Sequence, residues 1–305
     1  MRRLFSRLFV FALLFVAIDF AIGKGFSQLV AKTKGGDTGK NNEIADKTRA
    51  DIILFGSSRC DHHYDPRIIA DSLHESCYNA GRDGNGILMM YPYYQMLSSR
   101  YQPKMILYDL SGFDLEEDDH AKYLEWLRQF YGRLVVDSMV WAINPDERYK
   151  MMCQSYRYNG KGLQVISDAI HPIQQDIFGY KPLEGALDYD PPKDTTSVCV
   201  QKPIDNFKEK YLVRFIQDCK RSGTKLIFFV SPTYGQTRRS VYYEAILHLC
   251  RKYGVPFFYH QNDRRFVYNR KYFRDCSHLN HIGAEQYTKL VVTEINKLPD
   301  KRNSH

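Results

Sequence analysis

Short, unbroken apolar runs alternate with helical patterns along most of this chain. The first run, at 51–56, reads DIILFG and ends in glycine, as strands that are buried on both faces of a sheet often do. Similar runs lie at 76–80, 104–110, 224–230 and 255–259. Helical patterns lie between or after these runs, at 66–73, 87–100, 207–222, 239–253 and 283–297. This alternation predicts an α/β fold built on a doubly wound parallel sheet of about five strands with right-handed crossovers.

The region from about 115 to 204 interrupts this alternation. Helical patterns at 121–130 and 132–142 are followed by a Tyr-, Gly- and Pro-rich stretch without a clear period. About 90 residues are too many for a plain crossover between two strands. We therefore predict a flavodoxin-like domain over 50–298 with a mainly helical cap inserted over the carboxyl edge of its sheet, where such sheets bind ligands. A polar tail, 299–305, ends the chain.

The N-terminal segment predicts the compartment. The chain is largely apolar over Leu4–Ile22, interrupted by Arg7 and Asp19, and basic residues precede this stretch. Roughly 20 helical residues cross a bilayer, and basic residues ahead of such a helix favour a cytoplasmic N-terminus. We interpret 1–28 as an uncleaved transmembrane anchor that leaves the remaining domain outside the cytoplasm; a cleaved signal peptide is the alternative. Asp19 marks either a helix partner or, more simply, the outer interface.

The composition also predicts a linker and excludes some functions. Residues 29–49 are rich in Gly, Lys, Asn and Asp, which predicts a flexible stalk between membrane and domain. The net charge is +8, but basic residues are scattered among acidic ones, so we expect no nucleic-acid partner. The seven cysteines include no C-x-x-C pair, so a structural zinc site is not expected. Three cysteines inside apolar runs are predicted to be buried: Cys77, Cys219 and Cys250.

Two serines follow the first predicted strand directly, at Gly56-Ser57-Ser58-Arg59. A hydroxyl at this place lies at the carboxyl edge of the sheet, close to backbone amides that can stabilise an oxyanion. Gly-Ser-Ser is also ordinary turn chemistry, so this pattern is weak by itself.

A second pattern, Asp275-Cys-Ser-His278, precedes the last helical pattern. An Asp three residues before a His can accept a hydrogen bond from Nδ1 while Nε2 points outward. A serine, a histidine base and an orienting carboxylate are the parts of an acyl-transfer triad in any chain order. The glycine-rich turn from Asn79 to Gly86 follows the second predicted strand and can supply a backbone N–H to the same oxyanion.

Taken together, the blocks resemble those of the SGNH, or GDSL-like, hydrolase superfamily over about residues 50–297. Its Gly-Asp-Ser-Leu block corresponds to Gly56-Ser57-Ser58-Arg59, its Asn-x-x-x-x-Gly block to Asn79 through Gly84, and its Asp-x-x-His block to Asp275 through His278. The resemblance implies Ser58, rather than Ser57, as the nucleophile with His278 and Asp275. It further implies the N–H groups of Ser58 and Gly84 as the oxyanion hole, and a mechanism without cofactor or metal.

Ser-Ser-Arg in place of Asp-Ser-Leu is similar to the membrane-anchored branch of the superfamily, whose members esterify or de-esterify envelope polymers. The expected function is that of a serine esterase or O-acyltransferase that acts outside the cytoplasm on an acylated cell-envelope glycan. For transfer, the branch implies a polytopic membrane acyltransferase as a partner that supplies acyl groups. The residues for hydrolysis and for transfer are the same, so the sequence does not separate the two.

One block departs from the family pattern. Where the family has Gly-x-Asn-Asp, this chain has Ser111-Gly112-Phe113-Asp114, so Phe113 replaces a side-chain oxyanion donor. Losing one such donor costs on the order of 3 kcal/mol in the reaction barrier. Phe113 therefore favours the alternative function, a catalytically weak or inactive glycan-binding or assembly protein that keeps the fold.

The run Asp61-His62-His63-Tyr64-Asp65 contains metal-ligating residue types. Neighbouring side chains in an extended loop point apart, and no second cluster with its own ligand spacing accompanies the run. We therefore do not expect a metal site here, and a metal-dependent phosphoesterase is the least favoured class.

Overall fold

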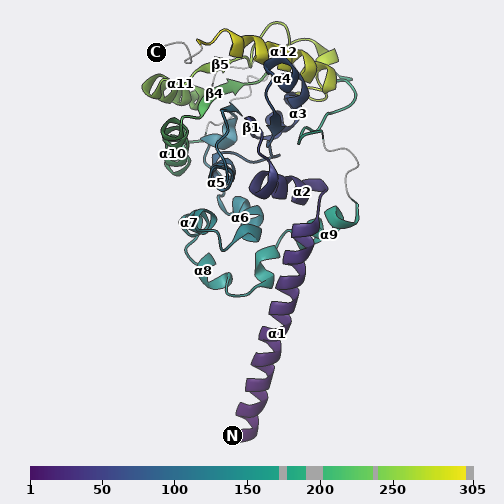
Figure 1. The fold of residues 1–305 in the computed structure, drawn as a ribbon, viewed down its shortest axis with the longest axis vertical. Coiled ribbons are helices and arrows are strands. Elements are labelled where there is room, and N and C mark those ends of the chain that lie inside the picture. Colours follow the sequence, from purple (N-terminus) through teal and green to yellow (C-terminus); the bar gives the residue numbers. More distant parts are fainter. Residues whose placement is uncertain (172–176, 190–201, 236–239, 300–305) are drawn as a thin grey trace. The chain divides into compact units, whose positions relative to one another are not determined.

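Five parallel strands form a single sheet in the computed structural model, which describes residues 1–171, 177–189, 202–235 and 240–299. Their order is β2-β1-β3-β4-β5, which is the flavodoxin-like order (Figure 1). The strands are β1 (Ile52–Gly56), β2 (Cys77–Asn79), β3 (Met105–Asp109), β4 (Lys225–Val230) and β5 (Phe257–Tyr259). Each lies within an apolar run of the sequence, so the predicted fold class is confirmed.

Helices cover both faces of this sheet because successive strand residues point to opposite sides. On one face, Leu54 packs in a buried cluster with residues of α12, including Tyr287. On the other face, the ring of Phe55 contacts that of Phe215 in α10 at 6.3 Å between centroids. The helices are α3 (Ser58–His63), α4 (Pro66–Leu73), α5 (Ile87–Ser98), α10 (Asn206–Ser222), α11 (Val241–Tyr253) and α12 (His281–Asn296).

Local sequence accounts for where several helices begin and end. The Asp65 carboxylate accepts the N–H of Arg67 ahead of α4, and the Asn280 side chain accepts that of Gly283 at the start of α12. Gly223 and Gly254 follow α10 and α11 with positive φ angles of 79° and 68°, a conformation that glycine adopts readily.

The chain divides into two compact units. The larger unit, Thr48–Asp118 with Asp176–His305, contains the sheet and the helices described above. The smaller unit, Met1–Lys47 with Asp119–Gln175, contains the helices α1 (Arg2–Lys32), α2 (Gly36–Asn42), α6 (Ala121–Leu127), α7 (Leu134–Ile143), α8 (Glu147–Lys150) and α9 (Gly162–Ile170). The insertion is thus mainly helical where it is described, as predicted. Its position over the sheet stays a prediction, and residues 300–305 of the predicted tail lie outside the described residues.

Residues 29–49, predicted to be a flexible stalk, are instead largely helical and buried in the smaller unit. A π-helical turn, Glu43–Lys47, follows α2, and Ile44 is completely buried. The Thr38 N–H donates to Asp168 (2.9 Å), and the Asn42 side-chain amide donates to the carbonyl of Val30 (2.6 Å). The polar composition was misleading because these polar groups find hydrogen-bond partners inside the unit and are not solvated.

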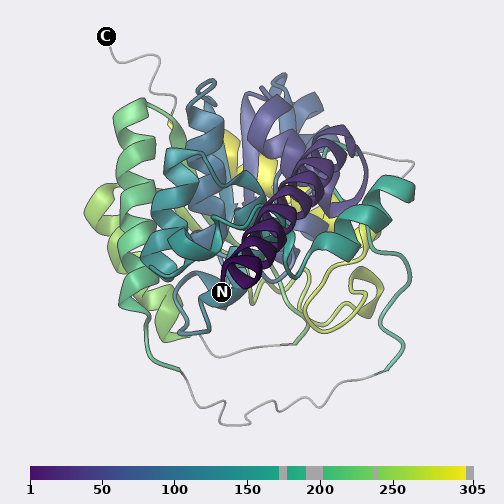
Figure 2. The same cartoon turned by 90° about the horizontal axis from the view of Figure 1, so that it is seen from below.

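Helix α1 is long and apolar enough to cross a membrane, which is compatible with an anchor or a signal sequence. Its N-terminal part projects beyond the other elements of the smaller unit, toward the viewer in Figure 2. Asp19 does more than lie at the outer interface, which was the simpler of the two interpretations of its position. Its carboxylate accepts hydrogen bonds from Gln154 N (2.7 Å), Ser155 N (3.0 Å) and Ser155 Oγ (2.6 Å). It therefore marks a partner contact within the smaller unit.

Candidate active site

Ser58, His278 and Asp275, which the sequence singles out, meet in the larger unit. The Ser58 hydroxyl donates to His278 Nε2 at 2.8 Å, and His278 Nδ1 lies 3.0 Å from both Asp275 carboxylate oxygens. Asp275 also accepts the backbone N–H groups of Ser277 (2.7 Å) and His278 (2.9 Å). Because the carboxylate holds both the ring and the backbone of its own turn, Nδ1 carries the ring proton and Nε2 is left to accept from Ser58.

The backbone after β1 places Ser58 at the switch point of the sheet. Ser58 is the first residue of α3, and β1 lies between β2 and β3. Gly56 takes φ 146° directly before the turn, and a Cβ there would lie 2.5 Å from the Asp109 carbonyl oxygen. Only glycine fits so close to β3. The turn therefore brings the Ser58 hydroxyl to the carboxyl edge, where sheets of this order bind ligands.

The charge state of Asp275 suits an orienting role. Partial burial opposes its negative charge, but the hydrogen bonds from His278 and from the N–H groups of Ser277 and His278 outweigh burial and lower the pKa of Asp275. The carboxylate is therefore ionised at neutral pH and able to stabilise positive charge on the imidazole.

The Asn79–Gly84 turn is built around a buried amide. Asn79 donates to the carbonyls of Cys60 (2.7 Å) and Tyr64 (3.0 Å) and accepts the N–H of Gly81 (2.9 Å), so it ties the turn to α3. Gly84 is exposed, has φ 68° and has open space around the position of a Cβ. The predicted oxyanion role of the Gly84 and Ser58 N–H groups stays a prediction.

The third block is held by its aspartate. The Asp114 carboxylate accepts from Tyr108 Oη (2.5 Å) and Ser111 N (2.8 Å), and burial raises the pKa of Asp114 to about 6 against these bonds. A Cβ on Gly86, at the start of α5, would lie 2.4 Å from the Phe113 carbonyl oxygen. The backbone of Phe113 therefore lies directly against the start of α5. The Phe113 side chain is 38% exposed. An aromatic ring therefore stands at the position for which the resemblance implies a polar donor.

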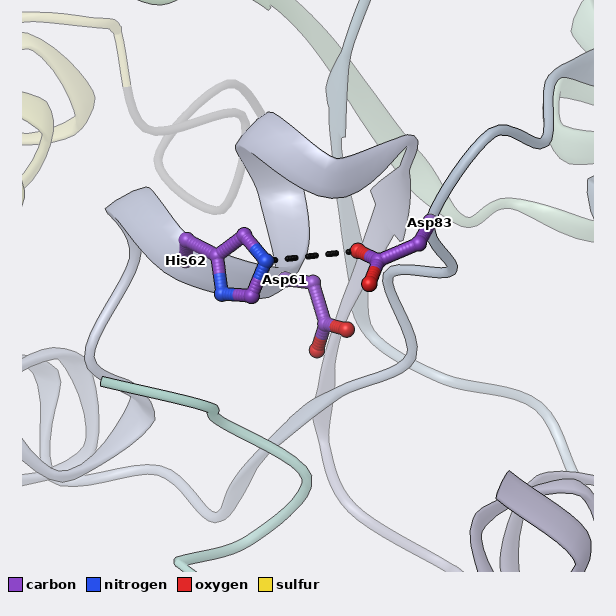
Figure 3. Close-up of side chains that lie close together, drawn as sticks. All are labelled: Asp61, His62 and Asp83. Carbon is purple, nitrogen blue, oxygen red and sulfur yellow. Dashed lines mark ion pairs between the residues drawn. The ribbon is translucent and has the colours of Figure 1, made fainter. Parts of the chain in front are cut away.

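Asp61, His62 and Asp83 form the one group within the described residues whose ligand atoms are close enough together to hold a metal ion (Figure 3). His62 Nδ1 lies 2.7 Å from the Lys181 carbonyl and Nε2 lies 3.3 Å from Asp83, so both ring nitrogens face acceptors. Burial opposes the charge of His62, but the Asp83 side chain and the Lys181 carbonyl outweigh it and raise its pKa. The Lys181 ammonium lies 3.2 Å from the Asp61 carboxylate. Lys181 thus already neutralises Asp61, and both ring nitrogens of His62 are held by acceptors, so the group fits a metal poorly.

His63, which the sequence presents only as a metal-like residue, links the ends of two strands to the His278 turn. Its Nε2 accepts the N–H of Leu279 (2.9 Å), so its Nδ1 must carry the proton and donate to Ser231 Oγ (2.9 Å). The Ser231 hydroxyl in turn donates to Asp109 Oδ2 (2.9 Å). The chain of bonds runs from the ends of β3 and β4, through α3, to the residue that follows His278.

Electrostatics keep His63 in the neutral form that these bonds need. Burial first, and then the positive charge of Arg59, lower its pKa well below the usual value. This network was not predicted from the sequence, although Asp109 and Ser231 each stand at or directly after the end of an apolar run. Polar residues at the carboxyl ends of neighbouring strands were the available signal.

Comparisons with known proteins give structural neighbours only. No family model and no curated protein matches the sequence. Among solved structures, one described as a lipolytic protein of the G-D-S-L family from Desulfitobacterium hafniense has 6% identity and TM-score 0.42, over 79% of this chain and 97% of that chain. An alpha/beta hydrolase enzyme from the Lake Arreo metagenome has 11% identity and TM-score 0.45, over 83% and 98%. A family two carbohydrate esterase from Clostridium thermocellum, in complex with cellohexaose, has 12% identity and TM-score 0.40, over 80% and 63%.

One of these neighbours is described as lipolytic and one as a carbohydrate esterase, and the G-D-S-L family is the one whose sequence blocks this chain resembles. At such low identities and TM-scores they carry no argument about what this chain does. A function has to be argued from the geometry of the site.

Proposed function

We propose that the chain is a serine-dependent esterase or O-acyltransferase that acts on an acylated cell-envelope glycan outside the cytoplasm. The observation that carries the proposal is the unbroken hydrogen-bonded series from Ser58 Oγ through the His278 ring to Asp275, with distances of 2.8 and 3.0 Å. A hydroxyl, a base whose free nitrogen accepts from it, and an ionised orienting carboxylate are what nucleophilic acyl transfer requires.

In the proposed mechanism, His278 Nε2 takes the Ser58 proton as Oγ attacks the ester carbonyl carbon. The N–H groups of Ser58 and Gly84 hold the oxyanion of the tetrahedral intermediate. When the intermediate collapses, the C–O bond to the alcohol breaks, His278 returns the proton to the leaving alkoxide, and an acyl-Ser58 ester remains. Asp275 stays ionised and stabilises the imidazolium in both steps.

Water or a sugar hydroxyl then attacks the acyl-Ser58 carbonyl, with His278 as the base again. Water gives hydrolysis and a sugar hydroxyl gives transfer to a glycan. For transfer, we propose that a polytopic membrane acyltransferase supplies the acyl group. No cofactor takes part in either route.

We also propose that α1 is an uncleaved anchor with its N-terminus in the cytoplasm. Its length and apolar composition and the preceding Arg2 and Arg3 support this orientation. The hydrogen bonds of Asp19 to Gln154 and Ser155 support retention of the helix, because cleavage near Gly23 would remove Asp19 from the smaller unit.

Phe113 favours one alternative, a protein that binds or assembles glycan without turning it over. Its ring occupies the position of a family oxyanion donor. The intact hydrogen bonding of Ser58, His278 and Asp275 is the main argument against this alternative.

The experiment that tests the proposed function is labelling of the full-length protein in detergent with a fluorophosphonate probe, followed by mass spectrometry. We expect one covalent adduct, on Ser58, because His278 activates only that hydroxyl. Heat-denatured protein and Ser58→Ala are the controls and should stay unlabelled. Absence of labelling in the folded protein would favour the binding alternative, and an adduct on Ser57 would show that the wrong serine was chosen.

A second prediction concerns His63 as a positioning residue. We expect His63→Leu to lower kcat for a small aryl ester by about 10²-fold with little change in KM, because freeing the Leu279 N–H lets the His278 turn move, and a shift of about 1 Å can cost that much. His63→Gln, whose amide can accept from Leu279 and donate to Ser231, should recover most of the rate. A His63→Leu protein with a lower melting temperature but wild-type kcat would assign His63 to stability alone.

A further inference from the structure

The short helix α8 and the turn after it expose apolar side chains that the smaller unit does not use. Tyr149 is 66% exposed and Met152 is 77% exposed, and the basic residues Arg148 and Lys150 are exposed beside them. The segment is firmly held, because buried Glu147 accepts from Arg128 Nε at 2.8 Å. We refer to Arg148, Tyr149, Lys150 and Met152 as the α8 face.

The turn that carries the α8 face is attached to α1 at a defined height. Asp19 accepts the N–H groups of Gln154 and Ser155, directly after Met152 in the chain. One turn further along α1, a Cβ on Gly23 would lie 2.4 Å from Gln154 Cβ, so the two backbones are in close contact. The turn after α8 therefore lies beside α1 at the level of Asp19 to Gly23. Figure 1 shows α8 at the end of the smaller unit from which the free part of α1 projects.

The free part of α1 is too short to span a bilayer without reaching this level. From Leu4 to Ile18 a helix is about 22 Å long, and the hydrocarbon core of a bilayer is about 30 Å thick. The large apolar side chains between these two residues are all more than half exposed. If the core starts near Leu4, its outer boundary falls at or beyond Asp19, which is where the turn after α8 is attached.

We propose that the α8 face lies in the interfacial layer of the phospholipid bilayer that α1 spans. This inference rests on the proposed anchor but adds a second contact with the membrane, made by the folded unit itself. Tyr149 and Met152 enter the boundary between headgroups and acyl chains, as aromatic and apolar residues at membrane interfaces do. Arg148 extends its charged end to the lipid phosphates, and Lys150, whose ammonium lies 3.1 Å from Glu147, adds to the positive charge beside it. The bonds of Asp19 satisfy its charge at the depth where burial would otherwise be costly.

Tryptophan quenching by brominated lipid tests this placement in the full-length protein. Three variants are reconstituted separately in nanodiscs of phosphatidylcholine with or without bromine on the upper acyl chain: Met152→Trp, Phe11→Trp in α1, and Ile170→Trp, an exposed position at the end of α9 in the same unit. The wild-type protein supplies the background from its own Trp126 and Trp141. We expect the added fluorescence of Met152→Trp and Phe11→Trp to be quenched. That of Ile170→Trp should be unchanged, because α9 is bonded through Asp168 to Thr38, beyond the C-terminal end of α1.

The controls separate this inference from the anchor. Quenching of Phe11→Trp together with a Met152→Trp signal no more quenched than that of Ile170→Trp would overturn the interfacial placement and leave the anchor standing. An unquenched Phe11→Trp would overturn the anchor, and the interfacial placement with it. Circular dichroism and melting curves of each variant confirm that the folded unit is present before quenching is compared.

Discussion

Replacing Ser58 with alanine is expected to lower hydrolysis of a small aryl ester by a factor of roughly 10³ or more, the size of loss that follows removal of a nucleophile from a triad. The reason is that Ser58 Oγ is the hydroxyl that is hydrogen-bonded to His278 Nε2. His278→Ala should cause a loss of similar size, because both residues act in the same step. The measurement is kcat/KM with the full-length protein in detergent, accompanied by its melting temperature.

Ser57→Ala is the matched control for this experiment. Ser57 is buried, directly precedes Ser58, and its side chain makes no capping hydrogen bond to α3. Its loss should change the rate little and leave the melting temperature near that of the wild type. A dominant effect of Ser57→Ala with a near-normal rate for Ser58→Ala would contradict the assignment of the nucleophile.

Deleting residues 1–47 is expected to unfold the rest of the smaller unit, although the deleted segment was predicted to be only anchor and stalk. Val30 packs with Tyr158 and Val165, and Ile44 is completely buried. Each buried Val or Ile side chain contributes about 1.5–3 kcal/mol, and a small domain has about 5–15 kcal/mol in total. Limited proteolysis with mass spectrometry should therefore find rapid cleavage within 119–171 of the truncated protein.

A shorter deletion, of residues 2–16, is the control for this loss. The removed part of α1 is exposed throughout, whereas Asp19, Val30 and Ile44 remain. We expect 119–171 to be as resistant to protease as in the full-length protein in detergent. Equal resistance of this region after deletion of 1–47 would mean that the insertion folds without the N-terminal segment.

The sheet and its flanking helices could be predicted because their signals are local. Each of the five strands lies in an apolar run, and α4 occupies the predicted range 66–73. Hydrophobic periodicity and helix-end signals such as Asp65-Pro66 involve only a few neighbouring residues. They can therefore be recognised without knowing which other element the segment packs against. Ser58 could be placed at the carboxyl edge for a related reason, since topology brings strand ends to one edge whatever the intervening chain does. Its assignment with Asp275 and His278 came from the spacing of these two residues and from the resemblance of the blocks to the SGNH superfamily.

The predictions from composition were wrong for polar segments that are buried in the structure. Thr38, Asn42 and Asp19 all suggested solvent or an interface, yet each is bonded to a residue far away in the chain or in a different element. A sequence shows the cost of burying a polar group but not the partner that offsets that cost. The pairing of the N-terminal segment with the insertion was invisible for this reason.

By itself, the sequence determined a doubly wound α/β unit, an apolar N-terminal helix and a short set of candidate residues, because these follow from periodicity and spacing. Only the tertiary structure decided that Ser58 Oγ reaches His278 Nε2 and that His63 holds the turn beside it. It also decided that α1 continues into a folded unit and fixes the α8 face at the level of Asp19. Such facts depend on distances between residues far apart in the chain, which are set by packing of the whole molecule and not by any local pattern.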